Sequence, residues 1–307
     1  MNFNTAVSQI LILFIIMFIG IIAKRTRVIN KNTESSISTL IMNIAMPALV
    51  LASTNFEKNS EVLPNMINIL IITVVSYLVI ILGSTLLAKA LKYEKVKANV
   101  FISLIVFANV GFMGYPVIRA LLAEIGVFYA SIVNLVFNVL VWTYGILLFN
   151  RKDGLEFKKL LNIGTVSSLV AILIFLLGIR LPYPVQTALD LTGKMTAPLS
   201  MLLIGALIAE IDVKKLISDK KVYFVSIIRL IMVPVATAFI LKAIATNSMV
   251  TSICTIMAAM PSAATNAIFA NEFDSEPIFA SVGVFISTLM SILTIPLTVY
   301  ILANFIL

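Results

Sequence analysis

Long apolar stretches follow one another along almost the whole chain, and short polar segments separate them. A transmembrane helix needs ~20 apolar residues to cross the hydrocarbon core of a bilayer. Hydrophobic residues make up 61% of the 307 residues and charged residues only 12%, whereas a soluble domain carries about 25% charged residues. The composition therefore predicts an all-α integral membrane protein.

The ~20-residue criterion divides the chain into ten predicted spans. They cover residues 5–23, 33–53, 63–90, 97–122, 126–149, 160–179, 185–210, 221–243, 249–271 and 277–305.

Basic residues gather in every second connection between these spans. The connections after spans 1, 3, 5 and 7 are the basic ones, at 24–31, 89–97, 151–159 and 214–221. Lysine and arginine are enriched in cytoplasmic loops, so this alternation predicts that both termini are extracytoplasmic. The net charge of +8 then follows from membrane topology, and we expect no nucleic-acid partner.

The inventory of reactive side chains is small. The chain has no histidine and a single cysteine, Cys254, which excludes an intrachain disulfide framework and a thiolate metal cage. It contains no P-loop, no Ser-His-Asp set and no glycine-rich dinucleotide motif. We therefore expect no metal, no cofactor and no enzymatic activity.

Five spans precede the short basic linker 150–159 and five follow it. The first half, 1–149, begins outside and the second half, 160–307, begins inside, so the two halves are predicted to be inverted five-helix repeats.

Spans 4 and 9 are interrupted in their apolar middle. Residues 109–116 contain Gly111, Gly114 and Pro116, and residues 260–266 contain Pro261. Glycine and proline both disfavour continuous helix, although a single proline in a membrane helix most often only kinks it. Breaks at matching places in two halves are the better sequence pointer to a transporter's binding site.

These motifs resemble those of the auxin efflux carrier family. The resemblance rests on the Asn-x-Gly-x-x-Gly-x-Pro stretch of 109–116, on Ala259-Met260-Pro261 continuing to 269–273, and on Asn138 followed by Trp142 and Tyr144. It covers the whole chain. A departure is the short linker 150–159, where plant members often have a long cytoplasmic loop, so regulation through that loop does not carry over.

The resemblance implies the crossed-helix fold of sodium/proton antiporters and bile-acid symporters, with broken helices 4 and 9 crossing. It implies a scaffold of spans 1, 2, 6 and 7, a moving transport unit of spans 3–5 and 8–10, an elevator mechanism and a homodimer. It also implies an organic anion as substrate, such as malate, another carboxylate or an auxin-like aromatic acid.

The half-helix that follows each break exposes unpaired N–H groups and the positive end of its dipole, which suits an anion. We therefore predict a substrate site at the two breaks and at nearby amides. Its predicted residues are Asn109, Gly111, Gly114, Pro116, Asn138, Pro261, Ser262, Thr265, Asn266, Asn43 and Asn134. The simpler interpretation of each amide is a hydrogen bond between helices, worth about 0.6 kcal/mol.

Two matters stay open on the residues alone. Arg229 of span 8 can attract an anion, but it can also extend to the membrane surface or pair with a helix end.

No Asp or Glu lies near the centre of a span, which favours uncoupled or potential-driven movement. A symporter coupled to sodium or protons is the alternative, and an anion channel is a weaker one, because no continuous polar stripe is present. The compact length favours a bacterial inner membrane.

Overall fold

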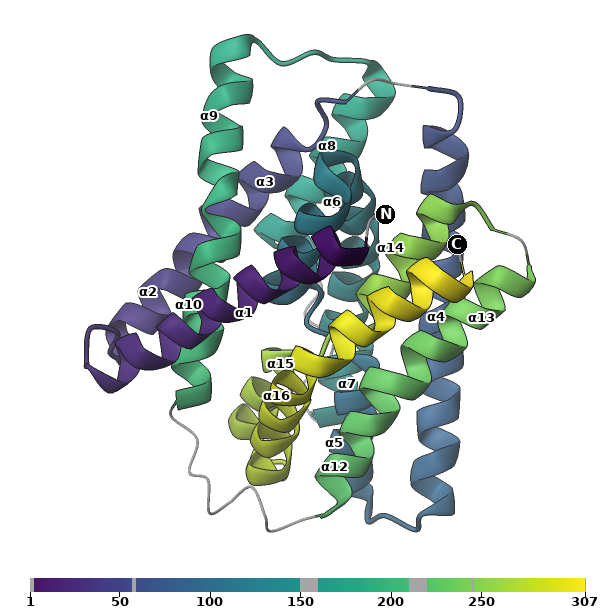
Figure 1. Ribbon diagram of the computed structural model, residues 1–307. Coiled ribbons are helices and arrows are strands. Elements are labelled where there is room, and N and C mark those ends of the chain that lie inside the picture. The colour runs from purple at the N-terminus through teal and green to yellow at the C-terminus, as the bar shows by residue number, and fades with distance from the viewer. Residues whose placement is uncertain (1–2, 57–58, 150–159, 210–219, 245, 307) are drawn as a thin grey trace. The chain divides into compact units, whose positions relative to one another are not determined.

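The computed structural model describes residues 3–56, 59–149, 160–209, 220–244 and 246–306, and the named elements in these ranges are all helices (Figure 1). The predicted linker 150–159 lies outside the described residues. Among the described residues, seven helices are long and apolar enough to cross a membrane. They are Val7–Arg25, Lys31–Ala52, Val62–Ala90, Val110–Phe149, Tyr183–Ala209, Lys220–Ala243 and Pro277–Ile306, and shorter apolar helices cover Ile163–Leu177 and Ser248–Ala258. The prediction of an all-α membrane protein is confirmed.

The chain divides into two compact units. Unit 1 comprises Met1–Ile67, Val110–Asn138 and Leu160–Glu210, and unit 2 comprises Asn68–Asn109, Val139–Lys159 and Ile211–Leu307. Unit 1 thus contains predicted spans 1, 2, 6 and 7 together with the start of span 3, the second half of span 4 and the first half of span 5. The division into scaffold and transport unit stays a prediction.

The helices of unit 1 come from three separate segments of the chain. They are α1 (Phe3–Arg25), α2 (Lys31–Leu40), η1 (Ile41–Ala45), α3 (Met46–Ala52), η2 (Val110–Gly114), α6 (Tyr115–Leu140, of which the last residues belong to unit 2), α8 (Ile163–Leu177), α9 (Tyr183–Lys194) and α10 (Thr196–Ala209). Asn30 and Asn162 begin α2 and α8 by accepting a backbone N–H with their side chains, as N-cap residues do.

Within α6, Ala123 adopts φ 53° and ψ −151°. A positive φ is costly for a residue with a Cβ, and here it marks the turn between two helical parts. This turn lies between the predicted end of span 4 at 122 and the predicted start of span 5 at 126, although Val110–Phe149 also counts as one membrane-length helix.

The helices of unit 2 also come from three separate segments of the chain. They are α4 (Val62–Ala90, which starts in unit 1), α5 (Lys95–Val106), η3 (Val141–Gly145), α7 (Ile146–Phe149), α12 (Lys220–Ile227), η5 (Ile228–Met232), α13 (Val233–Ala243), α14 (Ser248–Ala258), α15 (Ala264–Glu272), α16 (Pro277–Ile301) and η6 (Leu302–Ile306).

Three prolines each follow a π-helical stretch by two residues. Pro47 follows η1, Pro116 follows η2 and Pro234 follows η5. Proline has no N–H, and its ring clashes with the carbonyl four residues before it. The wider π-helical turn changes the hydrogen-bond register just before the ring, so these prolines are accommodated without ending the helix.

Helices α1 and α10 touch through glycines on both sides. A Cβ built on Gly205 would lie 1.9 Å from the backbone oxygen of Met17, and one on Gly20 would lie 2.3 Å from that of Leu202. Small residues at a membrane-helix interface allow this close approach of backbones. The two glycines therefore set the distance between α1 and α10.

We expect Gly205→Ala to destabilise the protein by about 1–3 kcal/mol, because a methyl group there forces packed backbones apart. Gly83→Ala is the matched control, since a Cβ at Gly83 meets nothing within 4 Å and alanine favours helix over glycine. Thermal unfolding in detergent, followed through the single Trp142, measures both variants. Equal melting temperatures for the two variants would contradict this account of the interface.

Candidate functional site

Two interrupted helices meet inside unit 2. The first, α5, ends at Val106 and continues into Phe107, whose backbone is extended (φ −93°, ψ 101°). The second, α14, ends at Ala258, and after Ala263, which is also extended (φ −69°, ψ 145°), the chain becomes helical again as α15. Both interruptions lie in apolar spans, as the sequence predicted.

The first interruption begins earlier than predicted. The non-helical residues are 107–109, whereas Gly111 and Gly114 lie in the π-helical stretch η2 and Pro116 lies in the first turn of α6. The prediction that Gly111–Pro116 forms the break is therefore wrong. The physical reason is that the π-helical turn of η2 changes the hydrogen-bond register just before Pro116, so the proline continues the helix instead of breaking it.

The two extended segments pair with each other as a short antiparallel bridge. Its centre is Ala108 opposite Ser262. The Asn109 N–H donates to the Pro261 carbonyl at 2.7 Å, and the Ala263 N–H donates to the Phe107 carbonyl at 2.9 Å. In a bilayer core, backbone groups freed from a helix need protein partners. Here each broken helix supplies them to the other.

Side chains close the same crossing. Ser262 Oγ donates to the Leu104 carbonyl at 2.7 Å, and the Ser262 N–H donates to Ser287 Oγ at 3.1 Å. Asn266 Nδ2 donates to the Phe107 carbonyl at 3.1 Å, and Ser103 Oγ donates to Asn266 Oδ1. Both ends of the Asn266 amide thus bond to the protein itself, which is the helix-to-helix role rather than a free ligand position.

Arg229, in the π-helical stretch η5, binds the carbonyl ends of both interrupted helices. Its Nη1 donates to Ile105 at the end of α5 (3.0 Å). Its Nη2 and Nε donate to Ala258 (2.9 Å) and Met260 (3.0 Å) at the end of α14. The side chain is only 2% exposed, so it does not extend to the surface. Of the two structural roles left open, pairing with helix ends is the one observed.

The N-terminal end of α15, unlike the carbonyl ends of α5 and α14, has backbone groups without hydrogen-bond partners in the described chain. Ala263 provides no side-chain cap, and in the described part of the chain the N–H groups of Ala264 and Thr265 make no hydrogen bond. The Thr265 hydroxyl is also without a hydrogen-bond partner there. Both residues are half-buried. This end therefore offers three donors and a partial positive charge.

Aromatic side chains of the fifth span pack on the crossing helices. The ring of Tyr144 lies 6.5 Å from that of Phe107, and the ring of Trp142 lies 5.7 Å from that of Phe269 on α15. Both distances are typical of favourable aromatic pairs. The pair that supported the family resemblance thus packs against the elements that build the crossing.

The other predicted site residues belong to unit 1. Asn138 Nδ2 donates to the Asn134 carbonyl at 2.9 Å, and Asn162 Nδ2 donates to Asn138 Oδ1 at 3.4 Å. Asn43 is exposed on η1. Gly111 is half-buried, and the side chain of Met46 lies nearest to it.

Sequence reasoning missed three polar side chains with defined roles. Ser103 and Ser287 bond to the crossing, and Asn162 joins the amide pair of unit 1. A serine in a membrane helix gives no local signal, because it usually bonds to its own helix. Asn162 did carry a signal, since an Asn just before an apolar run is a typical N-cap.

Comparison with known proteins agrees with this architecture. A family model described as membrane transport protein matches residues 5–158 and 154–299. An "uncharacterized transporter" of Methanocaldococcus jannaschii is 24% identical over 96% of this chain and 98% of its own. The "uncharacterized transporter YfdV" of Escherichia coli K12 is 21% identical (96% and 97%), and a Methanothermobacter thermautotrophicus transporter is 25% identical (97% and 98%). The chain therefore belongs to the membrane transport protein family, the auxin efflux carrier family that its broken-helix motifs resemble.

Proposed function

We propose that the protein is a secondary carrier that moves a small organic anion, a carboxylate such as malate or an auxin-like aromatic acid, across a bacterial inner membrane. The observation that carries this proposal is a difference in hydrogen bonding between the helix ends at the crossing. The carbonyl ends of α5 and α14 are neutralised by Arg229, while the amide end of α15 is left with free donors.

The charge balance favours an anion. A helix C-terminus carries about −0.5 elementary charge and an N-terminus about +0.5. Two C-terminal ends therefore amount to about −1, which one guanidinium offsets. In the described part of the chain Arg229 has no carboxylate partner that would cancel it further. The half-helix dipole of α15 remains uncompensated, and a carboxylate is its natural complement.

Alternating access is the mechanism that this arrangement supports. The crossing is bonded through its own backbone and side chains, so it can move as one body with its anion. The antiparallel pairing of Ala108 with Ser262 is compatible with two inverted repeats that meet at their broken helices. We propose ten membrane helices in two inverted repeats, an elevator-type movement and, following the family, a homodimer with both termini outside.

The test of the proposed function is uptake by proteoliposomes containing the purified full-length protein. Malate, succinate and indole-3-acetate are supplied at increasing concentration, with and without sodium and at several pH values. A carrier gives saturable uptake of at least one of them. Uptake that rises linearly with concentration indicates a channel, and a requirement for sodium or a proton gradient selects the coupled alternative.

We expect Thr265→Val to raise KM roughly three- to tenfold, the loss of about one hydrogen bond to a charged ligand. Thermal stability should stay the same or rise slightly, because the buried hydroxyl has no protein partner to lose. The control is Thr237→Val on α13, whose hydroxyl bonds to Val233 of its own helix and whose KM should not change. A wild-type KM in Thr265→Val would argue against the amide end of α15 as the site.

Arg229→Gln should lower stability by about 3 kcal/mol or more, because it withdraws charge-assisted hydrogen bonds from three buried carbonyls. Arg229→Lys keeps the charge but not the planar fork, so its melting temperature should lie between those of wild type and Arg229→Gln. Thermal unfolding in detergent measures this order, with exposed Arg25→Gln as the control. Wild-type stability in Arg229→Gln would contradict the role given to Arg229.

A further inference from the structure

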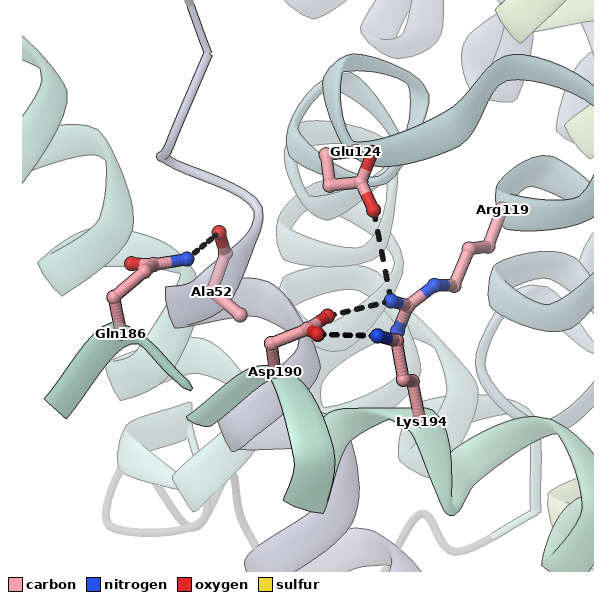
Figure 2. Close-up of polar contacts among 6 residues, drawn as sticks. All are labelled: Ala52, Arg119, Glu124, Gln186, Asp190 and Lys194. Atoms are coloured by element: carbon pink, nitrogen blue, oxygen red, sulfur yellow. Dashed lines mark hydrogen bonds and ion pairs between the residues drawn. The ribbon is translucent and has the colours of Figure 1, made fainter. Parts of the chain in front are cut away.

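A second group of charges lies in unit 1, between α6 and α9 (Figure 2). Arg119 of α6 donates from Nη2 to Oδ1 of Asp190 at 2.8 Å, and Lys194 Nζ lies 2.5 Å from Oδ2 of the same carboxylate. Glu124 is 3.6 Å from the Arg119 guanidinium. One carboxylate therefore bridges two cations, with each of its oxygens on a different one.

Helix α9 holds Asp190 and Lys194 on a firm support. Gln186, Asp190 and Lys194 are spaced by four residues, so they share one face of α9. Gln186 Nε2 donates to the Ala52 carbonyl at the end of α3 at 2.9 Å, as Figure 2 shows. A Cβ on Gly193 would lie 2.6 Å from the Leu49 Cα, so α9 and α3 are in backbone contact. The bridging carboxylate is thus preorganised.

Arg119 uses only part of its hydrogen-bonding capacity. Its Nη2 binds Asp190, whereas Nη1 is buried and has no hydrogen-bond partner in the described chain. A guanidinium can bind a carboxylate with two parallel hydrogen bonds. Asp190 cannot complete this fork while its other oxygen is held by Lys194. The resting ion pair therefore leaves one buried donor unsatisfied, which is costly.

The four side chains differ in exposure. Lys194 is 57% exposed, Glu124 47%, Asp190 28% and Arg119 16%. Arg119 also lies one helical turn before Ala123, the turn that ends this part of α6. Solvent therefore reaches Lys194 most and Arg119 least of the four side chains.

We propose that Arg119 and Lys194 form a carboxylate-binding subsite. In the absence of ligand the Asp190 carboxylate binds both cations, and the transported anion displaces it from Arg119. The arriving carboxylate takes the Nη1–Nη2 fork of Arg119, and Asp190 keeps its ion pair with Lys194. The exchange leaves no charge unpaired, and it satisfies the donor that the resting state leaves open. This inference rests on the proposed function, since it assigns the subsite to the carboxylate that the carrier moves.

A purely structural ion pair between α6 and α9 makes a different prediction. If the ion pair only clamps the helices, Arg119→Gln and Asp190→Asn remove the same interaction and act in the same direction. If Asp190 competes with the ligand, Asp190→Asn strengthens anion binding and Arg119→Gln weakens it. The signs of the two effects separate these cases.

The experiment is a thermal-shift titration of the full chain in nanodiscs with succinate. Relative to wild type, we expect Asp190→Asn to lower the half-saturating concentration about tenfold and Arg119→Gln to raise it about tenfold, the factor for one charge-assisted hydrogen bond. Arg119→Lys keeps the charge without the fork, so it should also raise the concentration. The double variant Asp190→Asn with Arg119→Gln should lose the gain of Asp190→Asn.

The control variant is Arg180→Gln, which removes one exposed positive charge and should leave succinate binding unchanged. An effect of Arg180→Gln as large as that of Arg119→Gln would reduce the subsite to a diffuse surface potential and overturn the proposal. Equal signs for Asp190→Asn and Arg119→Gln, wild-type binding in Arg119→Lys, or no succinate binding by any variant would also overturn it.

Succinate uptake by proteoliposomes keeps the subsite and the proposed function apart. Absence of saturable uptake in all variants, together with the expected order of binding, would support the subsite and refute the carrier. Saturable wild-type uptake, with the same KM in Arg119→Gln and Asp190→Asn, would support the carrier and refute the subsite.

Discussion

A break in a membrane helix sets free backbone N–H and C=O groups in a medium that offers them no water. At the crossing in unit 2, these groups are satisfied by the other broken helix, by serine and asparagine side chains, and by Arg229. Every other feature of the crossing depends on these hydrogen bonds to the freed backbone groups. Without them, α5 and α14 would have to continue as smooth helices, and no amide end would lie inside the span.

The same hydrogen bonds also explain how a buried arginine is tolerated. Burying an unpaired charge is very costly, and in the described chain Arg229 has carbonyl oxygens rather than a carboxylate as partners. Those oxygens belong to the ends of two helices, where the dipoles are negative. A cation there lowers the energy of groups that had lost their helical partners. The charge and the breaks therefore stabilise each other.

The sequence predicted the membrane class, the two interrupted spans and the family. It placed the first break too late, at Gly111–Pro116, because glycine and proline are local signals whereas the break is fixed by pairing with a segment about 150 residues away. The same non-local pairing hid Ser103 and Ser287. The sequence also could not show which asparagines join two helices. Asn266 has a side chain that could bind a substrate, but its amide is hydrogen-bonded to Phe107 and Ser103 of the other broken helix. Thr265, another predicted site residue, differs from Asn266 because its hydroxyl has no hydrogen-bond partner in the described chain.

Arg229 and Arg119 differ in whether their hydrogen-bond acceptors can move away. Backbone carbonyls at a helix end cannot move away without unravelling the helix, so Arg229 is fixed for as long as the crossing exists. Asp190 is a side chain with a second cation beside it, so it can release Arg119 without becoming unpaired. An exchangeable partner is what a transient ligand site requires, and a permanent partner is what a structural cation requires. The physical distinction lies in the acceptor rather than in the arginine, so residue type alone does not separate the two roles.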